Sequence, residues 1–294
     1  MRFALDESAM LEKCRRLQWS VADIDWEAPG GDVGDEARRD LAPFLADLYW
    51  IESIAAIVFQ AMSETATHPR RAAIFASFAG DEQRHADAEL LLMRRWKMVG
   101  RREVPAPNPN ARNLIRALDR TAHRVHPAVF SAIIPFTELV LDGALVKHLE
   151  VKITDPVCGE VFKRINADEA RHLAVDFYLL EQFGATLSGA DVRRLALSAF
   201  SRPLVMYGLL LGYLPMLTRT RKTIERAGLT EEQLLACVRR YVALGDQSKG
   251  AARHPTYRVF RSISRGILAG RADVGELLMK VSDLCDVPGW RIAA

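Results

Sequence analysis

The chain has 294 residues, 49% of them hydrophobic, so it can bury a large core in one big domain or two smaller ones. Its formal net charge of +3 is too small and too dispersed to indicate a nucleic-acid-binding protein. The four cysteines show no paired spacing, which argues against a disulfide scaffold or an iron–sulfur cluster. The N-terminal residues lack the apolar run of a secretory signal, and we expect a soluble, cytoplasmic protein.

A polar N-terminal extension, residues 1–39, precedes the first clear helical periodicity, which begins near Leu41. A first helix is predicted over residues 41–67 and a second from Pro69 to about residue 99. Proline is well placed at the first position of a helix, so the break before Pro69 separates the two.

A long connection is predicted to follow, over residues 100–123, because prolines at positions 105, 107 and 109 interrupt regular structure. A third helix is predicted over residues 127–153 and a fourth over residues 157–183. No strand-like alternation occurs in this part of the chain. The pattern therefore predicts an all-α fold in which a crossover joins the second and third helices.

We expect residues 40–185 to form a four-helix bundle and residues 186–294 to form accessory helices packed on it, within a single domain of residues 1–294. The longest apolar stretch lies in the C-terminal part, at residues 203–217. It is shorter than the about 20 residues that a membrane-spanning helix needs. We predict a buried helix there and no stable membrane insertion.

Nearly the same five-residue phrase occurs twice, as DEQRH at residues 81–85 and as DEARH at residues 168–172. A lone glutamate lies upstream of each phrase at nearly the same distance. Residues at i and i+3 share one face of a helix, so the glutamate and histidine of each phrase can bind one metal ion. The predicted ligands of this two-metal site are Glu52, Glu82, His85, Glu138, Glu169 and His172.

The sequence around the lone glutamates is strongly apolar, and a buried carboxylate is costly unless it is paired or bound to a metal. Carboxylate oxygen and imidazole nitrogen suit iron or manganese without discriminating between them. We therefore expect two metal ions, which we take to be iron, with manganese as the alternative.

The aspartate and arginine of each phrase are repeated together with the ligands. A metal-bound imidazole usually donates its second N–H to a carboxylate, a carbonyl or water, which fixes its orientation. We expect Asp81 and Asp168 to accept such hydrogen bonds, with Arg84 and Arg171 balancing their charge. The alternative is a set of surface ion pairs of little consequence.

Two further polar residues lie one helical turn from a lone glutamate and are candidate catalytic groups, Tyr49 before Glu52 and Asp142 after Glu138. Small residues near the ligands leave two interpretations open, either space for a substrate or close helix packing. These residues are Ala55, Ala56, Gly143 and Ala144. The remaining histidines, at positions 123, 126, 148 and 254, have no partner pattern and are predicted to be structural or exposed.

The motifs resemble those of the ferritin-like di-iron carboxylate superfamily over about residues 40–185. The DExRH phrase is similar to that of bacterial multicomponent monooxygenase hydroxylase subunits and acyl-carrier-protein desaturases. Residues 19–26, WSVADIDW, resemble the segment before the bundle in ribonucleotide reductase small subunits. The resemblance implies O2 as co-substrate, electrons from a ferredoxin or reductase, and a small organic substrate that is free or bound to a carrier protein.

Three positions depart from particular members of that superfamily. Reductase small subunits usually have aspartate where this chain has Glu52, and a radical tyrosine where it has Glu89, which disfavours a radical-generating subunit. Arylamine N-oxygenases have an additional histidine at the position of Ile165, which puts that activity in doubt.

The leading hypothesis is a di-iron oxygenase, most simply a monooxygenase that hydroxylates its substrate. A desaturase or an N-oxygenase on the same scaffold is the alternative within enzymes. An iron-handling protein or a manganese catalase is the alternative of another class. The sequence leaves the oligomeric state open, a homodimer included.

Overall fold

The computed structural model describes residues 3–31, 33–186, 188, 190–191, 202–228 and 230–269, and for residues 140–152 it describes the backbone alone. All regular structure in these residues is helical, and none of them lies in a strand. The prediction of an all-α protein is confirmed.

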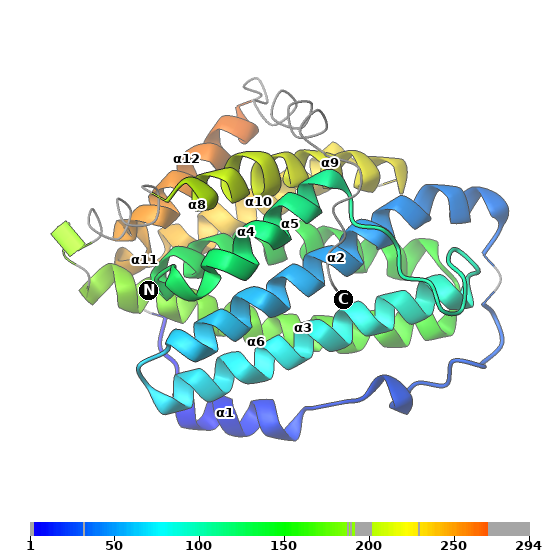
Figure 1. The fold of residues 1–294 in the computed structure, drawn as a ribbon, viewed down its shortest axis with the longest axis horizontal. Helices are drawn as coiled ribbons and strands as arrows, with labels where there is room; N and C mark the ends of the chain where they lie inside the picture. The colour runs from blue at the N-terminus through cyan, green and yellow to red at the C-terminus, as the bar shows by residue number, and fades with distance from the viewer. Residues whose placement is uncertain are drawn as a thin grey trace.

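Two pairs of long helices form the centre of the molecule (Figure 1). The first pair is α2 (Asp35–Thr65) with α3 (Pro69–Arg95), and the second is α5 (Pro127–Lys152) with α6 (Pro156–Thr186). The pairs meet where α3 contacts α6 and where α2 contacts α5. Each of the four coincides with a predicted helix, although α2 begins six residues earlier than predicted.

The predicted connection between the pairs contains a helix of its own, α4 (Pro109–Thr121). Asn108 begins it as the N-cap, since its side chain accepts a hydrogen bond from the backbone N–H of Ala111 at 2.9 Å. Pro109 occupies the first turn, where its missing N–H costs nothing. The expectation of irregular structure throughout residues 100–123 is wrong, because Pro109 starts a helix here instead of stopping one.

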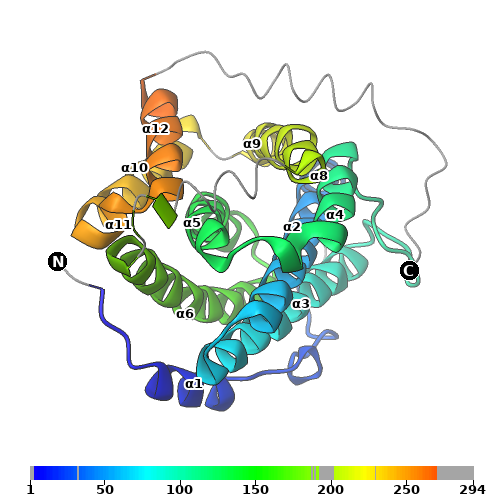
Figure 2. The same cartoon turned by 60° about the vertical axis from the view of Figure 1, so that its left-hand side comes forward.

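The helices that follow residue 202 lie on one side of the central pairs, and α1 (Glu7–Arg16) lies on the opposite side, against α3 (Figure 2). The helices after residue 202 pack on α2, α4, α5 and α6. In chain order they are α8 (Pro203–Tyr207), η3 (Gly208–Tyr213), α9 (Leu214–Arg226), α10 (Glu231–Asp246), α11 (Lys249–Arg253) and α12 (Pro255–Leu268).

The segment η3 is a π-helix, and α4 compensates for its irregular backbone. The carbonyl of Leu211 accepts hydrogen bonds from the side-chain amides of Asn110 and Asn113, both fully buried. Gly208 and Gly212 allow the two segments to approach closely, because a Cβ on either would lie less than 3 Å from α4. The η3–α4 contact is therefore a fixed wall of the molecule.

Within the described residues, α2 is the one helix long and apolar enough to cross a membrane by length and composition alone. Half of its most apolar stretch is buried inside the protein, and it carries the buried carboxylate of Glu52. A core helix of a soluble protein has the same properties, so α2 is compatible with the expected soluble protein.

Candidate metal centre

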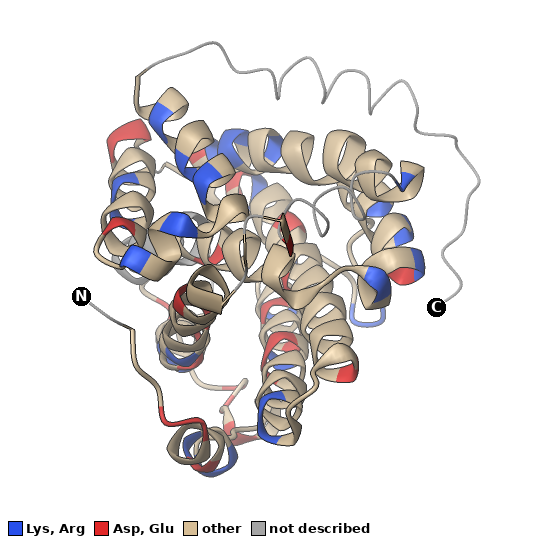
Figure 3. Ribbon diagram, turned by 90° about the vertical axis from the view of Figure 1, so that its left-hand side faces the viewer, with Lys and Arg blue, Asp and Glu red and all other residues tan. Residues whose placement is uncertain are grey.

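The structure brings all six predicted ligand residues together in the interior. Glu52 comes from α2 and Glu138 from α5, whereas α3 and α6 each supply a glutamate and a histidine one turn apart. Every one of the six side chains is buried. Acidic residues occur on the inner helices and also on outer ones, and Lys and Arg are likewise spread over many helices (Figure 3).

The six residues form two groups that share two members. Glu52, Glu82, His85 and Glu169 make one group, and each can offer an atom within 4.8 Å of all the others. The second group has the same geometry and contains Glu82, Glu138, Glu169 and His172. Glu82 and Glu169 belong to both groups, as expected of carboxylates that bridge two metal ions.

Both histidines point Nδ1 into this cluster. His85 Nδ1 lies 3.2 Å from Glu169 Oε1 and 3.7 Å from Glu52 Oε2. His172 Nδ1 lies 3.0 Å from Glu82 Oε1 and 3.8 Å from Glu138 Oε1. The rings are held on their other side, for example by Phe78, whose centroid is 4.1 Å from that of His172.

The donor set fits a metal pair, because the described residues leave many of its atoms without a well-formed hydrogen bond. Both Nδ1 atoms, both oxygens of Glu138 and one oxygen each of Glu82 and Glu169 are buried without a hydrogen bond of good geometry. Such atoms are costly to bury unless they bind something. Two divalent cations would balance the four carboxylates and satisfy these atoms.

The pKa shifts within the cluster also indicate that its carboxylates are stabilised by positive charge. Burial, and then the neighbouring carboxylates Glu169 and Glu52, raise the pKa of Glu82. Burial opposes protonation of His85 and His172, but the surrounding carboxylates outweigh it and raise both pKa values. Burial likewise opposes ionisation of Glu169, yet the two histidines lower its pKa to about 2. Protons or metal ions can supply the missing charge.

The histidine of each DExRH phrase contacts the aspartate of the other phrase. Nε2 of His85, on α3, lies 3.1 Å from Asp168 Oδ2 on α6, and Nε2 of His172 lies 3.2 Å from Asp81 Oδ2 on α3. A carboxylate can only accept, so each Nε2 donates, and in the neutral ring each Nδ1 keeps its lone pair for a metal ion. Burial alone would raise the pKa of Asp168, but hydrogen bonds from His85 and Trp19 lower it.

The two predicted arginines are not equivalent. Arg171 is 1% exposed and reaches both aspartates, at 2.6 Å from Asp168 Oδ1 and 3.1 Å from Asp81 Oδ2. Arg84 pairs with Asp81, and 20% of its side chain is exposed. The buried bridge between the two halves of the site is therefore Arg171.

Two residues of the N-terminal extension donate hydrogen bonds to these aspartates, and the sequence did not indicate their roles. Trp19 donates its indole N–H to Asp168 Oδ2 at 2.7 Å and stacks near the ring of His85. Gln18 donates to Asp81 Oδ1 at 3.1 Å. The WSVADIDW phrase was a sequence signal for Trp19, where it begins, but it does not include Gln18.

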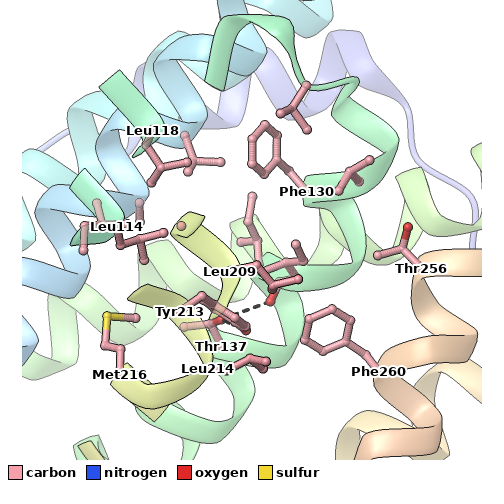
Figure 4. Close-up of a pocket in the computed structure, with 18 of the residues that line it drawn as sticks. Leu114, Leu118, Phe130, Thr137, Leu209, Tyr213, Leu214, Met216, Thr256 and Phe260 are labelled. Carbon is pink, nitrogen blue, oxygen red and sulfur yellow. Dashed lines mark hydrogen bonds between the residues drawn. The ribbon is translucent and has the colours of Figure 1, made fainter. Parts of the chain in front are cut away.

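A cavity of about 450 Å³ reaches the carboxylate face of the cluster, with Glu52, Glu82, Glu138 and Glu169 in its wall. The rest of its lining is almost entirely aliphatic and aromatic and comes from α2, α4, α5, η3, α9 and α12 (Figure 4). The volume lies within the range of small-molecule binding sites.

Three further predictions concerned the surroundings of the ligands. Ala55 lines the cavity, whereas Ala56 lines a separate depression that the ligands do not reach. Tyr49 is half-buried, packs edge-on against Trp50 and does not line the cavity, so the structure does not bring it to the site. The side chains of Asp142, Gly143, Ala144 and His148 lie outside the described residues.

Two buried carboxyl groups follow the histidines by one turn, Glu89 after His85 and Asp176 after His172. Burial, and then the nearby Glu169, raise the pKa of Asp176, and Glu138 lies close enough to hydrogen-bond with it. The duplicated acidic pattern thus continues one turn beyond the ligands.

A comparison with protein-family models, curated proteins and solved structures found no match to this chain.

Proposed function

We propose that this protein is a non-haem di-iron oxygenase that hydroxylates or otherwise oxygenates a small organic substrate. The observation that carries the proposal is the apolar cavity ending at the carboxylate face of a buried site made of four glutamates and two histidines. An iron-handling protein or a manganese catalase acts on ions or peroxide and has no need of a large hydrocarbon-lined chamber at its metals.

The proposal includes the fold family. The pairing of α2 with α3 and of α5 with α6, and the long connection that contains α4, support a ferritin-like four-helix bundle with a crossover. Its known pattern of one glutamate from each of two helices and Glu-x-x-His from the other two is met by the six residues named above. We include a soluble, cytoplasmic protein in the same proposal.

Two bound iron ions would supply the activation of O2. The ligands that would hold them are Glu52, Glu138, the two histidines and the bridging pair Glu82 and Glu169. The chain's own contribution is to fix both imidazoles through Asp81 and Asp168 and to exclude water with the aliphatic lining.

The overall reaction consumes a substrate C–H bond, O2, two electrons and two protons, and gives a C–OH product and water. The electrons must come from outside, so a ferredoxin or a reductase is part of the proposal. A desaturase is the second candidate, because the same oxidant acts in the same cavity and would remove two hydrogen atoms instead.

Metal analysis tests the proposal. The purified chain, loaded anaerobically with ferrous iron, should hold about two irons, and its optical spectrum should change when O2 is added to the reduced protein. His85→Ala and His172→Ala should each sharply lower iron content, whereas His123→Ala, at an exposed histidine, should not.

Other results would overturn it. A chain that takes up no transition metal, or one that retains iron after both histidine substitutions, contradicts the ligand assignment. Manganese uptake with rapid peroxide breakdown would establish the catalase alternative instead.

A further inference from the structure

Among the residues that the structure describes, the cavity has one charged end and an otherwise uncharged wall. Among its described lining residues the ionisable groups are the four glutamates, His254 and Tyr213, and no Lys or Arg is present. A substrate carboxylate or phosphate inside it would lose its hydration without gaining a cation from the protein wall. The lining therefore selects against anionic molecules.

The cavity also runs along α5. Its wall includes Ala128 in the first turn of this helix and Glu138 ten residues later, which are separated by about 15 Å along the axis. Its volume of about 450 Å³ corresponds to roughly 15 water-sized groups. An extended molecule with one end near Ala128 and the other at the glutamates fits this shape.

His254 lines the same cavity at the Ala128 end and is 1% exposed. Its Nδ1 accepts a hydrogen bond from the backbone N–H of Tyr257 at 3.4 Å, so Nε2 carries the hydrogen. Nε2 has no hydrogen bond of good geometry. The carbonyl of Ala128 lies within reach of the ring and opposes the fall in its pKa, and it also accepts from the hydroxyl of Ser131 at 3.1 Å.

Burial lowers the pKa of His254 to about 4, so the ring is neutral near pH 7. Three other hydroxyl groups of the wall already have hydrogen-bond partners. Thr121 donates to the carbonyl of Ala117 at 2.6 Å, and the hydroxyls of Thr137 and Tyr213 bond each other at 2.9 Å (Figure 4). The Nε2–H of His254 is thus a buried donor whose nearby acceptor among the described residues, the carbonyl of Ala128, is not in good hydrogen-bond geometry.

We infer that the cavity binds an uncharged, largely hydrocarbon substrate that carries one hydrogen-bond acceptor, and that His254 Nε2–H binds this acceptor. This arrangement places the end of the molecule remote from its polar group at Glu52 and Glu138. The binding preference stands on the cavity alone, whereas oxidation of that remote end rests on the proposed function.

Binding of three probes of similar length tests the inference. Methyl decanoate has an uncharged acceptor, undecane has none, and decanoate has a negative charge. Dissociation constants are measured by equilibrium dialysis of the full chain, as isolated and after anaerobic iron loading. We expect methyl decanoate to bind about threefold to tenfold more tightly than undecane, as one net hydrogen bond provides, and decanoate to bind least.

Two substitutions connect this preference with His254. In His254→Phe the advantage of methyl decanoate over undecane should fall to less than twofold, and in His254→Gln, which retains an N–H donor, part of it should remain. His123→Phe makes the same exchange at an exposed histidine and should keep the wild-type ratio. If His254→Phe does not fold, the wild-type comparison and His254→Gln still decide.

Equal binding of methyl decanoate and undecane by the wild-type chain would overturn the inference. So would an unchanged ratio in His254→Phe, or tightest binding of decanoate. If the expected affinities are found in a chain that holds no iron, the proposed oxygenase fails and the cavity assignment survives. If iron and O2 reactivity are present without the binding preference, the cavity assignment fails and the proposed oxygenase survives.

Discussion

Asp168 on α6 lies 3.1 Å from His85 on α3, so the histidine of the first DExRH phrase is held by the aspartate of the second. The reciprocal contact joins Asp81 to His172 at 3.2 Å. Each ligand pair thus depends on a side chain from the other half of the chain, and several measurable consequences follow from this arrangement.

Removing the carboxylate behind a ligand histidine should weaken metal binding without removing a ligand. Asp168→Ala is expected to lower metal affinity by about 10-fold to 100-fold, because His85 loses the partner that fixes its orientation. Chelator competition measures the affinity. Asp87→Ala, on the same helix as His85 but paired with Gln83, should bind metal as the wild type does; a similar loss in both variants would refute the specific role of Asp168.

The shared and unshared glutamates should differ in metal stoichiometry. Glu169 belongs to both ligand groups, whereas Glu52 belongs to one. Glu169→Ala is therefore expected to lose both metal ions, and Glu52→Ala to retain close to one. Elemental analysis of the desalted proteins gives the ratio. Equal stoichiometry in the two variants would contradict the two-group geometry.

The two arginines of the repeated phrase should contribute unequally to stability. Arg171→Met leaves two buried aspartates without their common cation and should lower the free energy of unfolding by about 3–5 kcal/mol. The matched change Arg84→Met removes a half-buried ion pair and should cost no more than about 1 kcal/mol. Urea denaturation of both metal-free variants measures the difference.

Gly212 should not tolerate a side chain. An added Cβ would lie 2.8 Å from the Cβ of Leu114 and 2.9 Å from its Cα, so Gly212→Ala must push η3 away from α4. We expect a loss of about 1–3 kcal/mol. Gly159→Ala, in α6, has no atom within 4 Å of the new Cβ and should be neutral or stabilising. Thermal unfolding that ranks the two alike would count against the tight η3–α4 wall.

His254 should make the protein less stable in acid. Its pKa is lowered from 6.5 to about 4 by burial, so between these values the unfolded chain binds a proton that the folded chain does not. Above pH 6.5 this proton uptake does not affect the free energy of unfolding. As the pH falls from 6.5 toward 4, the free energy of unfolding decreases, with a slope of at most about 1.4 kcal/mol per pH unit. Stability of His254→Phe, measured across this window, should depend less on pH than that of the wild type.

The pairing of the candidate ligands on each helix could be predicted from sequence because helical spacing is a local property. Glu82 and His85 share a helix face whatever surrounds them, and the same holds for Glu169 and His172. Three other features depend instead on how α3 meets α6 and on which helices cover α5. They are the contacts between each aspartate and the histidine of the other phrase, the different burial of Arg84 and Arg171, and the cavity. Those relations are tertiary, and no spacing in the chain encodes them.

Trp19 and His254 illustrate the same limit. Each is remote in sequence from the residues it serves, and His254 was expected to be a structural or exposed residue. The short helix α4 was missed for another reason, since prolines at positions 105, 107 and 109 read as a continuous interruption. Only the local cap formed by Asn108 turns the last of them into a helix start.

The crosswise aspartates have a consequence for assembly. If the chain were cut within residues 100–108, between α3 and α4, neither fragment would hold a complete ligand group or the carboxylates behind its own histidine. Metal uptake would then require both fragments, and the metal would in turn stabilise their association through mass action. Metal binding by a mixture of the two fragments would thus report the joining of the halves.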